Sequence, residues 1–171
     1  MILPPITAPY LAATALLGVA GIAKAVRPAD TATALRVAPA LVRTGAIAEI
    51  AVAVAALAAP GPVTGALVAA SYAAFAVFVV VALRRGWPLS SCGCFGQPDT
   101  PPTVAHAALN AAAAAAAVWW AVAWRGGEGL SRLGRLFFHQ PWHGGPLALV
   151  TVVLAGLAYL VWTDPLPAAR R

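Results

Sequence analysis

Five long apolar runs, separated by short connections, constrain this chain more than any other feature of its sequence. They cover roughly residues 9–26, 40–59, 63–83, 103–124 and 147–162. A helix needs about 20 predominantly apolar residues to cross the hydrocarbon core of a bilayer. Of the 171 residues, 61% are hydrophobic and only 9% are charged, whereas soluble domains carry about 25% charged residues. The sequence therefore predicts an integral membrane protein in contact with the lipid bilayer.

The order of these runs predicts an all-α fold: a polytopic membrane helical bundle with a four-helix core and a fifth transmembrane helix. We expect the core over residues 1–124, an interfacial connection over 125–145, and the fifth helix with a short basic tail over 146–171. The first run is expected to be a retained span, because no basic residue precedes Lys24 as a cleaved signal would require. The net charge of +6 lies mostly between the apolar runs. It fits juxtamembrane lysine and arginine better than nucleic-acid binding.

The connections and the small residues predict further details of the helices. The connection 27–39 offers Pro28 as a helix start and is expected to form a short interfacial helix. Gly18 and Gly21 in the first span allow close approach of a neighbouring helix. Thr100 or Thr103 can cap the fourth span. Residues 139–145, rich in glycine and proline, are expected to form a loop.

Both cysteines of the chain, Cys92 and Cys94, lie one residue apart in the polar connection 84–102 between the third and fourth spans. Four prolines from Pro88 onward keep this connection non-helical. A disulfide across one residue requires a bend at Gly93, because the usual Cα separation of about 5.5–6 Å is shorter than two extended residues. A strained, exposed disulfide exchanges readily. The pair therefore suits thiol–disulfide transfer better than a structural role.

The alternating direction of the spans gathers the unusual polar residues on the face that carries the cysteines. Glu49 lies near the middle of the second span, and His106 and Asn110, four residues apart, share one face of the fourth. Nearby cations favour the thiolate form of cysteine, and a histidine can shuttle protons. We expect a supporting polar pocket beneath the cysteines, formed by Lys24, Arg43, Glu49, Arg84, Arg85, His106 and Asn110.

Several of these residues have alternative interpretations. A lysine near a helix end usually extends its ammonium group to the lipid headgroups; we expect this for Lys24, with an inward-facing cation as the alternative. A carboxylate in mid-bilayer faces the interior of the bundle, so Glu49 makes either a structural hydrogen bond or a functional contact. The two thiolates with His106 could instead relay copper or zinc. A non-catalytic scaffold is the third alternative for the cysteines.

The sequence resembles the MauE family of methylamine-utilisation membrane proteins, which are related to the DoxX-like group of small helical bundles. The resemblance lies in Gly21-Ile22-Ala23-Lys24, Glu49, Arg85-Gly86, Cys92-Gly93-Cys94-Phe95-Gly96 and Asn110. It covers about residues 8–124, and Cys-Gly-Cys-Phe-Gly is its most specific part, with Gly93, Phe95 and Gly96 setting the loop geometry. It implies a redox-associated protein that helps a partner mature. The implied partners are a thioredoxin-like protein of the MauD type and a disulfide-containing client of the methylamine dehydrogenase type.

Together these patterns predict a thiol–disulfide oxidoreductase in the plasma membrane of a bacterium, with Cys92 and Cys94 as the catalytic pair. No resident metal is predicted; Glu49 and Asn110 would complete a pocket for a quinone that accepts electrons. The side of the membrane is open. Six basic residues on the cysteine face favour the cytoplasm by the positive-inside rule. Oxidative maturation favours the outer face, which we expect.

Overall fold

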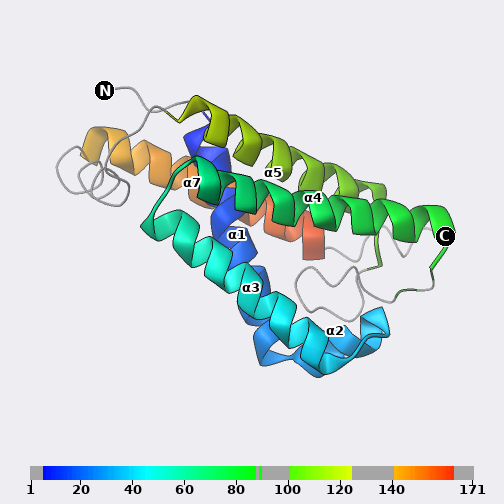
Figure 1. The fold of residues 1–171 in the computed structure, drawn as a ribbon. Helices are drawn as coiled ribbons and strands as arrows, with labels where there is room; N and C mark the ends of the chain where they lie inside the picture. The colour runs from blue at the N-terminus through cyan, green and yellow to red at the C-terminus, as the bar shows by residue number, and fades with distance from the viewer. Residues whose placement is uncertain (1–5, 88, 90–100, 125–140, 164–171) are drawn as a thin grey trace.

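The computed structural model describes residues 6–87, 89, 101–124 and 141–163, which form helices and turns without a strand. The helices of this part of the chain are α1 (Thr7–Val26), α2 (Pro28–Leu35), α3 (Pro39–Ala58), α4 (Pro62–Arg85), α5 (Val104–Ala123) and α7 (Pro141–Thr163) (Figure 1). All except the eight-residue α2 are long and apolar enough to cross a membrane. The predicted all-α bundle with five candidate membrane spans is confirmed.

Proline and glycine explain where several helices begin and end. Pro28, Pro39 and Pro62 each occupy the first turn of their helix, where the missing N–H costs no intrahelical hydrogen bond. At the other end of α4, Gly86 adopts a left-handed conformation with φ of 58°, and the Trp87 N–H donates to the Ala82 carbonyl over 3.0 Å. The predicted short helix in the connection 27–39 is confirmed as α2.

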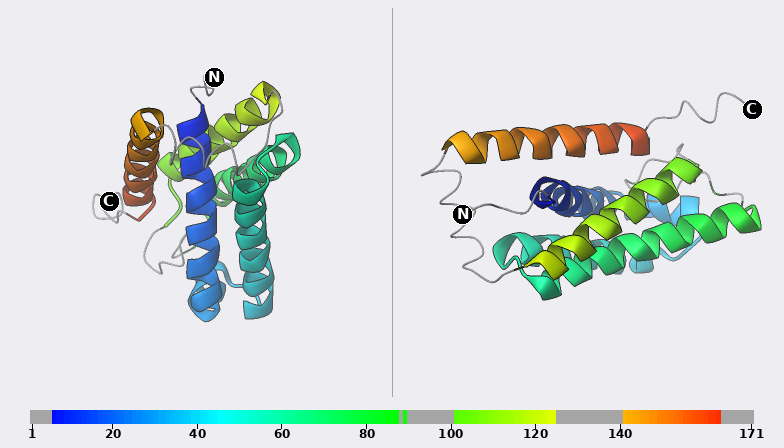
Figure 2. Two further views of the ribbon diagram at one scale, coloured as in Figure 1. Left: turned by 90° about the vertical axis from the view of Figure 1, so that its left-hand side faces the viewer. Right: turned by 90° about the horizontal axis from the view of Figure 1, so that it is seen from above.

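α1 lies in the middle of the bundle and packs against α3, α4, α5 and α7. Figure 2 shows α7 on the side of α1 that faces away from α3 and α4. The Tyr10 ring stacks on Trp120 of α5, with 4.6 Å between ring centroids, and the Tyr72 hydroxyl of α4 donates to the Ala13 carbonyl over 2.7 Å. These contacts fix α1 against the α4–α5 pair at its N-terminal half.

Glycines allow two helix pairs to approach closely. A Cβ on Gly21 of α1 would lie 2.9 Å from the Ala46 carbonyl oxygen and 2.9 Å from Ile50 Cγ1 of α3, and one on Gly18 would lie 3.3 Å from Ala53 Cβ. The predicted close approach at Gly18 and Gly21 is confirmed. Between α4 and α5, a Cβ on Gly65 would lie 3.1 Å from Ala121 Cβ.

The start of α7 differs from the sequence-based expectation. The helix begins at Pro141, so the loop predicted for residues 139–145 is wrong for 141–145. Pro141 is the first residue of the helix, where proline is tolerated. Pro146 is only the sixth residue, so its missing N–H removes one hydrogen bond near the helix start. The connection 125–140, expected at the membrane interface, lies outside the described residues.

The α3–α4 hairpin separates the bundle into two parts at one end. The two helices are joined by the short connection 59–61 and diverge from it, so that α2 and the beginning of α3 stand apart from the end of α4 (Figure 1). α4 instead pairs along α5. Residues of both diverging helices, among them Leu41 of α3 and Phe78 of α4, line a cavity.

Candidate functional site

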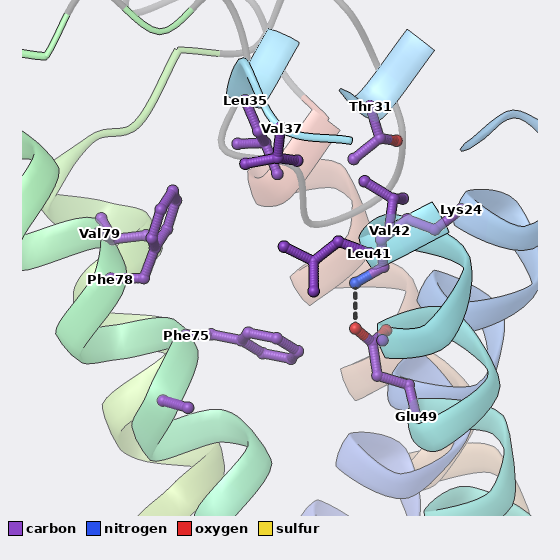
Figure 3. Close-up of a pocket in the computed structure, with 12 residues that line it drawn as sticks. Lys24, Thr31, Leu35, Val37, Leu41, Val42, Glu49, Phe75, Phe78 and Val79 are labelled. Carbon is purple, nitrogen blue, oxygen red and sulfur yellow. Dashed lines mark hydrogen bonds and ion pairs between the residues drawn. The ribbon is translucent and has the colours of Figure 1, made fainter. Parts of the chain in front are cut away.

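A buried ion pair between α1 and α3 is the centre of the candidate site. Lys24 Nζ in the last turn of α1 donates to Glu49 Oε1 in the middle of α3 (Figure 3). The two residues are only 6% and 9% exposed. The contact at Gly21, one turn before Lys24, brings the α1 backbone against α3 beside Glu49: a Cβ on Gly21 would lie 3.1 Å from Glu49 Cβ. A glycine contact therefore positions the ion pair.

Lys24 faces the interior of the bundle, so the expectation that it extends to the lipid headgroups is wrong. Its Nζ lies 4.9 Å from the centroid of the Phe75 ring on α4, in a cation–π contact. A buried ammonium group is unfavourable unless a charge partner and hydrogen bonds compensate its lost hydration. Glu49 and Phe75 supply that compensation from two neighbouring helices, which local sequence does not reveal.

A cavity of about 340 Å³ adjoins this ion pair. Figure 3 shows Phe75, Phe78 and Val79 of α4 facing the α2–α3 side of the cavity, where Glu49 and Thr31 lie. Most of the wall is apolar, and Gly45 of α3 forms part of it. The described residues that line the cavity are Lys24, Thr31, Leu35, Val37, Leu41, Val42, Gly45, Glu49, Ala74, Phe75, Phe78 and Val79.

Two polar atoms in the cavity wall have no hydrogen-bond partner among the described residues. They are Glu49 Oε2 and Thr31 Oγ1, both fully shielded from solvent. Burying a polar group without a partner usually costs about 1–3 kcal/mol in proteins. Both unpaired atoms belong to residues that line the same cavity, so a polar group bound there would lie next to a carboxylate and a hydroxyl whose hydrogen bonding is incomplete.

The α5 residues of the predicted pocket lie near the beginning of that helix. His106 is buried, its backbone N–H donates to Thr103 Oγ1 over 3.4 Å, and the Thr103 N–H donates to His106 Nδ1 over 3.0 Å. Thr103 therefore caps α5, which confirms one of the two predicted alternatives. In a neutral His106, Nδ1 is the acceptor of the hydrogen bond from the Thr103 N–H. Asn110, one turn further, is buried, and its Nδ2 has no partner among the described residues.

The predicted polar pocket is divided in the structure. Lys24 and Glu49 meet at the cavity, whereas His106 and Asn110 are absent from its described lining. Arg43, Arg84 and Arg85 are exposed. The Arg85 guanidinium stacks 5.9 Å from the Trp87 ring, an arrangement typical of a membrane-interface anchor. The motif residues Cys92, Gly93, Cys94, Phe95 and Gly96 lie outside the described residues.

Sequence reasoning did not identify Thr31, Gly45 or Phe78 as part of a site. Thr31 belongs to the eight-residue helix α2, whose sequence PADTATAL contains a second threonine and an aspartate, so nothing in it distinguishes Thr31 from a surface residue. Phe75 and Phe78 are three residues apart and share one helix face with Val79, which was the available signal. This spacing within α4 does not show that α3 diverges from that face and leaves it on a cavity.

The described part of the chain is that of a multi-pass membrane protein with a buried lysine–glutamate pair beside a cavity. The family model described as "Methylamine utilisation protein MauE" matches residues 3–123. The chain therefore belongs to the MauE family, whose members are membrane proteins associated with methylamine utilisation. No curated protein and no solved structure matches the chain. The predicted resemblance to this family is confirmed.

Proposed function

We propose that this protein exchanges thiols and disulfides in the plasma membrane of a bacterium, with Cys92 and Cys94 as the reacting pair. The proposal is carried by the position of both cysteines within the family match, in the connection between the end of α4 and the beginning of α5. A connection between two membrane-spanning helices lies at a membrane face, where a protein partner can reach it. The chain has no other cysteine with which either one could pair.

The exchange takes place in two steps with a thioredoxin-like partner of the MauD type. A partner thiolate attacks one sulfur of the Cys92–Cys94 disulfide, and the other cysteine leaves as a thiolate. The second partner thiolate then attacks the resulting mixed disulfide. The partner loses two electrons and becomes a disulfide, while Cys92 and Cys94 gain them and become thiols. The oxidised partner transfers its disulfide to a client of the methylamine dehydrogenase type.

Residues at the two ends of the cysteine connection support this chemistry. Arg84 and Arg85 end α4 and are exposed, so their positive charge is available to favour thiolate over thiol. His106 lies in the first turn of α5, and its imidazole is the titratable group best suited to proton transfer near neutral pH. Both contributions require the cysteines to approach these ends during the exchange.

Replacement of each cysteine by serine tests the proposal. In cells that produce the client, Cys92→Ser and Cys94→Ser should each abolish the support of client disulfide formation, measured as the fraction of client thiols protected from alkylation. Ser91→Ala, a matched change in the same connection, should leave that fraction unchanged. Full support by both cysteine variants would exclude thiol exchange. Stoichiometric copper or zinc that is lost on cysteine replacement would instead favour a metal relay.

A further inference from the structure

The cavity between α3 and α4 combines an apolar wall with polar groups that lack partners. We propose that it binds the ring of a membrane-soluble quinone, in its oxidised and reduced forms, and that this quinone accepts the electrons of the thiol exchange. The binding site is inferred from Lys24, Thr31, Glu49 and Phe75. The role of the ligand as electron acceptor rests on the proposed function.

The charges in the cavity favour a neutral ligand. An anionic group that approached Lys24 would also meet the carboxylate of Glu49, and a cationic group that approached Glu49 would meet the ammonium of Lys24. A lysine ammonium has three N–H donors, and one of them is used by Glu49 Oε1. The pair therefore offers a free donor on Lys24 and a free acceptor at Glu49 Oε2.

A quinone and its reduced form use both of these groups. A quinone carbonyl oxygen accepts a hydrogen bond from Lys24, and a hydroquinone hydroxyl donates one to Glu49 Oε2. Thr31 also lines the cavity, and its buried hydroxyl has no hydrogen-bond partner among the described residues. Filling these positions removes the penalty of unsatisfied buried polar atoms.

The size and lining of the cavity fit a flat ring with an apolar tail. Its volume of about 340 Å³ lies in the usual range of small-molecule sites. Phe75 and Phe78 offer aromatic surfaces for ring packing. Leu41 and Gly45 line the cavity and are exposed on α3, one of the helices that can cross the membrane. The cavity therefore opens within a spanning segment, where a lipid-soluble ligand is present.

The redox step balances with the quinone as oxidant. Cys92 and Cys94 lose two electrons and two protons as their S–S bond forms. The quinone gains two electrons and two protons and becomes a hydroquinone. The Lys24–Glu49 pair forms hydrogen bonds with a ring oxygen, and that oxygen receives one of the two protons. This step regenerates the disulfide that the thioredoxin-like partner consumes.

Gly45→Leu tests the site by filling the cavity. A Cβ at Gly45 meets no atom within 4 Å, so a larger side chain enters open space without a backbone clash. The probe is decylubiquinone, and its dissociation constant is measured on the protein in lipid nanodiscs, with binding to empty nanodiscs subtracted. We expect Gly45→Leu to raise the dissociation constant about tenfold or more, since the new side chain competes with the ring. Gly156→Leu on α7, where a Cβ also meets nothing within 4 Å, is the matched control and should change it less than about twofold.

The double variant Lys24→Met/Glu49→Leu provides a second test, because replacing both partners of a buried ion pair by apolar residues usually preserves folding. It should also weaken decylubiquinone binding about tenfold. In the wild type, decylbenzene, which lacks the ring oxygens, should not compete with decylubiquinone for the site. No saturable binding by the wild type, or unchanged affinity in both variants, would overturn the inference.

The cysteine double variant Cys92→Ser/Cys94→Ser separates the two proposals. It should bind decylubiquinone as the wild type does, because the residues from which the site is inferred, Lys24, Thr31, Glu49 and Phe75, are unchanged in it. Intact binding together with full client oxidation by this variant would support the quinone site and exclude thiol exchange. Absent binding together with client oxidation that depends on the cysteines would exclude the quinone site and leave thiol exchange in place.

Discussion

The Lys24–Glu49 pair gives the sharpest stability prediction, because the two residues are buried together. Removing one member leaves an uncompensated charge inside the bundle, which costs about 3–5 kcal/mol in buried pairs. We expect Glu49→Gln, which leaves Lys24 beside a neutral amide, to lower the free energy of unfolding by about 3 kcal/mol. Lys24→Met should lower it by a similar amount, since Glu49 then loses its charge partner.

The double variant Lys24→Met/Glu49→Leu should differ from the wild type by only about 1 kcal/mol, because it removes both charges of the buried pair together. Glu49→Leu, the single variant that completes the cycle, should also lose about 3 kcal/mol, so the two sites have an expected coupling energy of roughly 5 kcal/mol. The measurement is reversible unfolding in mixed detergent micelles, with sodium dodecyl sulfate as the denaturant. Arg84→Met removes an exposed charge as a control and should change the free energy of unfolding by less than about 0.5 kcal/mol.

Two results would refute this reasoning. If Glu49→Gln unfolds at the same detergent composition as the wild type, Lys24 does not depend on an ionised carboxylate. If the single-variant effects simply add in the double variant, the two side chains do not interact in the folded protein. Either result would also remove the charge argument for a neutral ligand in the cavity.

Three further predictions concern the backbone and the topology. Gly21→Ala should lower the free energy of unfolding by about 1–3 kcal/mol, because its Cβ would lie 2.9 Å from the Ala46 carbonyl oxygen. Gly45→Ala is the control and should be neutral or stabilising, since a Cβ there meets no atom within 4 Å. Equal effects of the two variants in detergent unfolding would contradict the close α1–α3 contact. Arg36→Gly should stabilise by up to about 1 kcal/mol, because Arg36 adopts a left-handed φ of 57°, and a loss of stability would contradict this. A membrane-impermeant maleimide should label Cys92 in a Cys94→Ser variant of intact cells; labelling only after lysis would place the connection in the cytoplasm.

The helices were predictable because their signals are local. Apolar length identifies the spans, and Pro28, Pro39 and Pro62 mark helix starts in the sequence itself. Thr103 was one of two predicted caps, and its hydroxyl has the spacing to His106 that a cap needs. The start of α7 was predicted too late, because Gly144, Gly145 and Pro146 suggest a loop when each is considered alone.

The site was less predictable because it depends on how helices cross. Lys24 has the sequence position of a lysine that extends to the headgroups, and only the contact of Gly21 with α3 places it beside Glu49. Thr31 and Phe78 meet one cavity because α3 and α4 diverge from their short connection. No spacing within either helix encodes that divergence. The sequence did suggest that Lys24 and Glu49 contribute to a polar pocket, but not that His106 and Asn110 lie outside the described cavity lining.

The redox state of Cys92 and Cys94 in native membranes tests the central claim most directly. Membranes are quenched with acid and alkylated with and without prior reduction, and the alkyl groups on the protein are counted by mass. We predict that a fraction of the protein takes up both alkyl groups only after reduction, and that this fraction falls when the thioredoxin-like partner accumulates in its reduced form. Cysteines that are fully alkylated without reductant under both conditions would contradict a cycle between dithiol and disulfide.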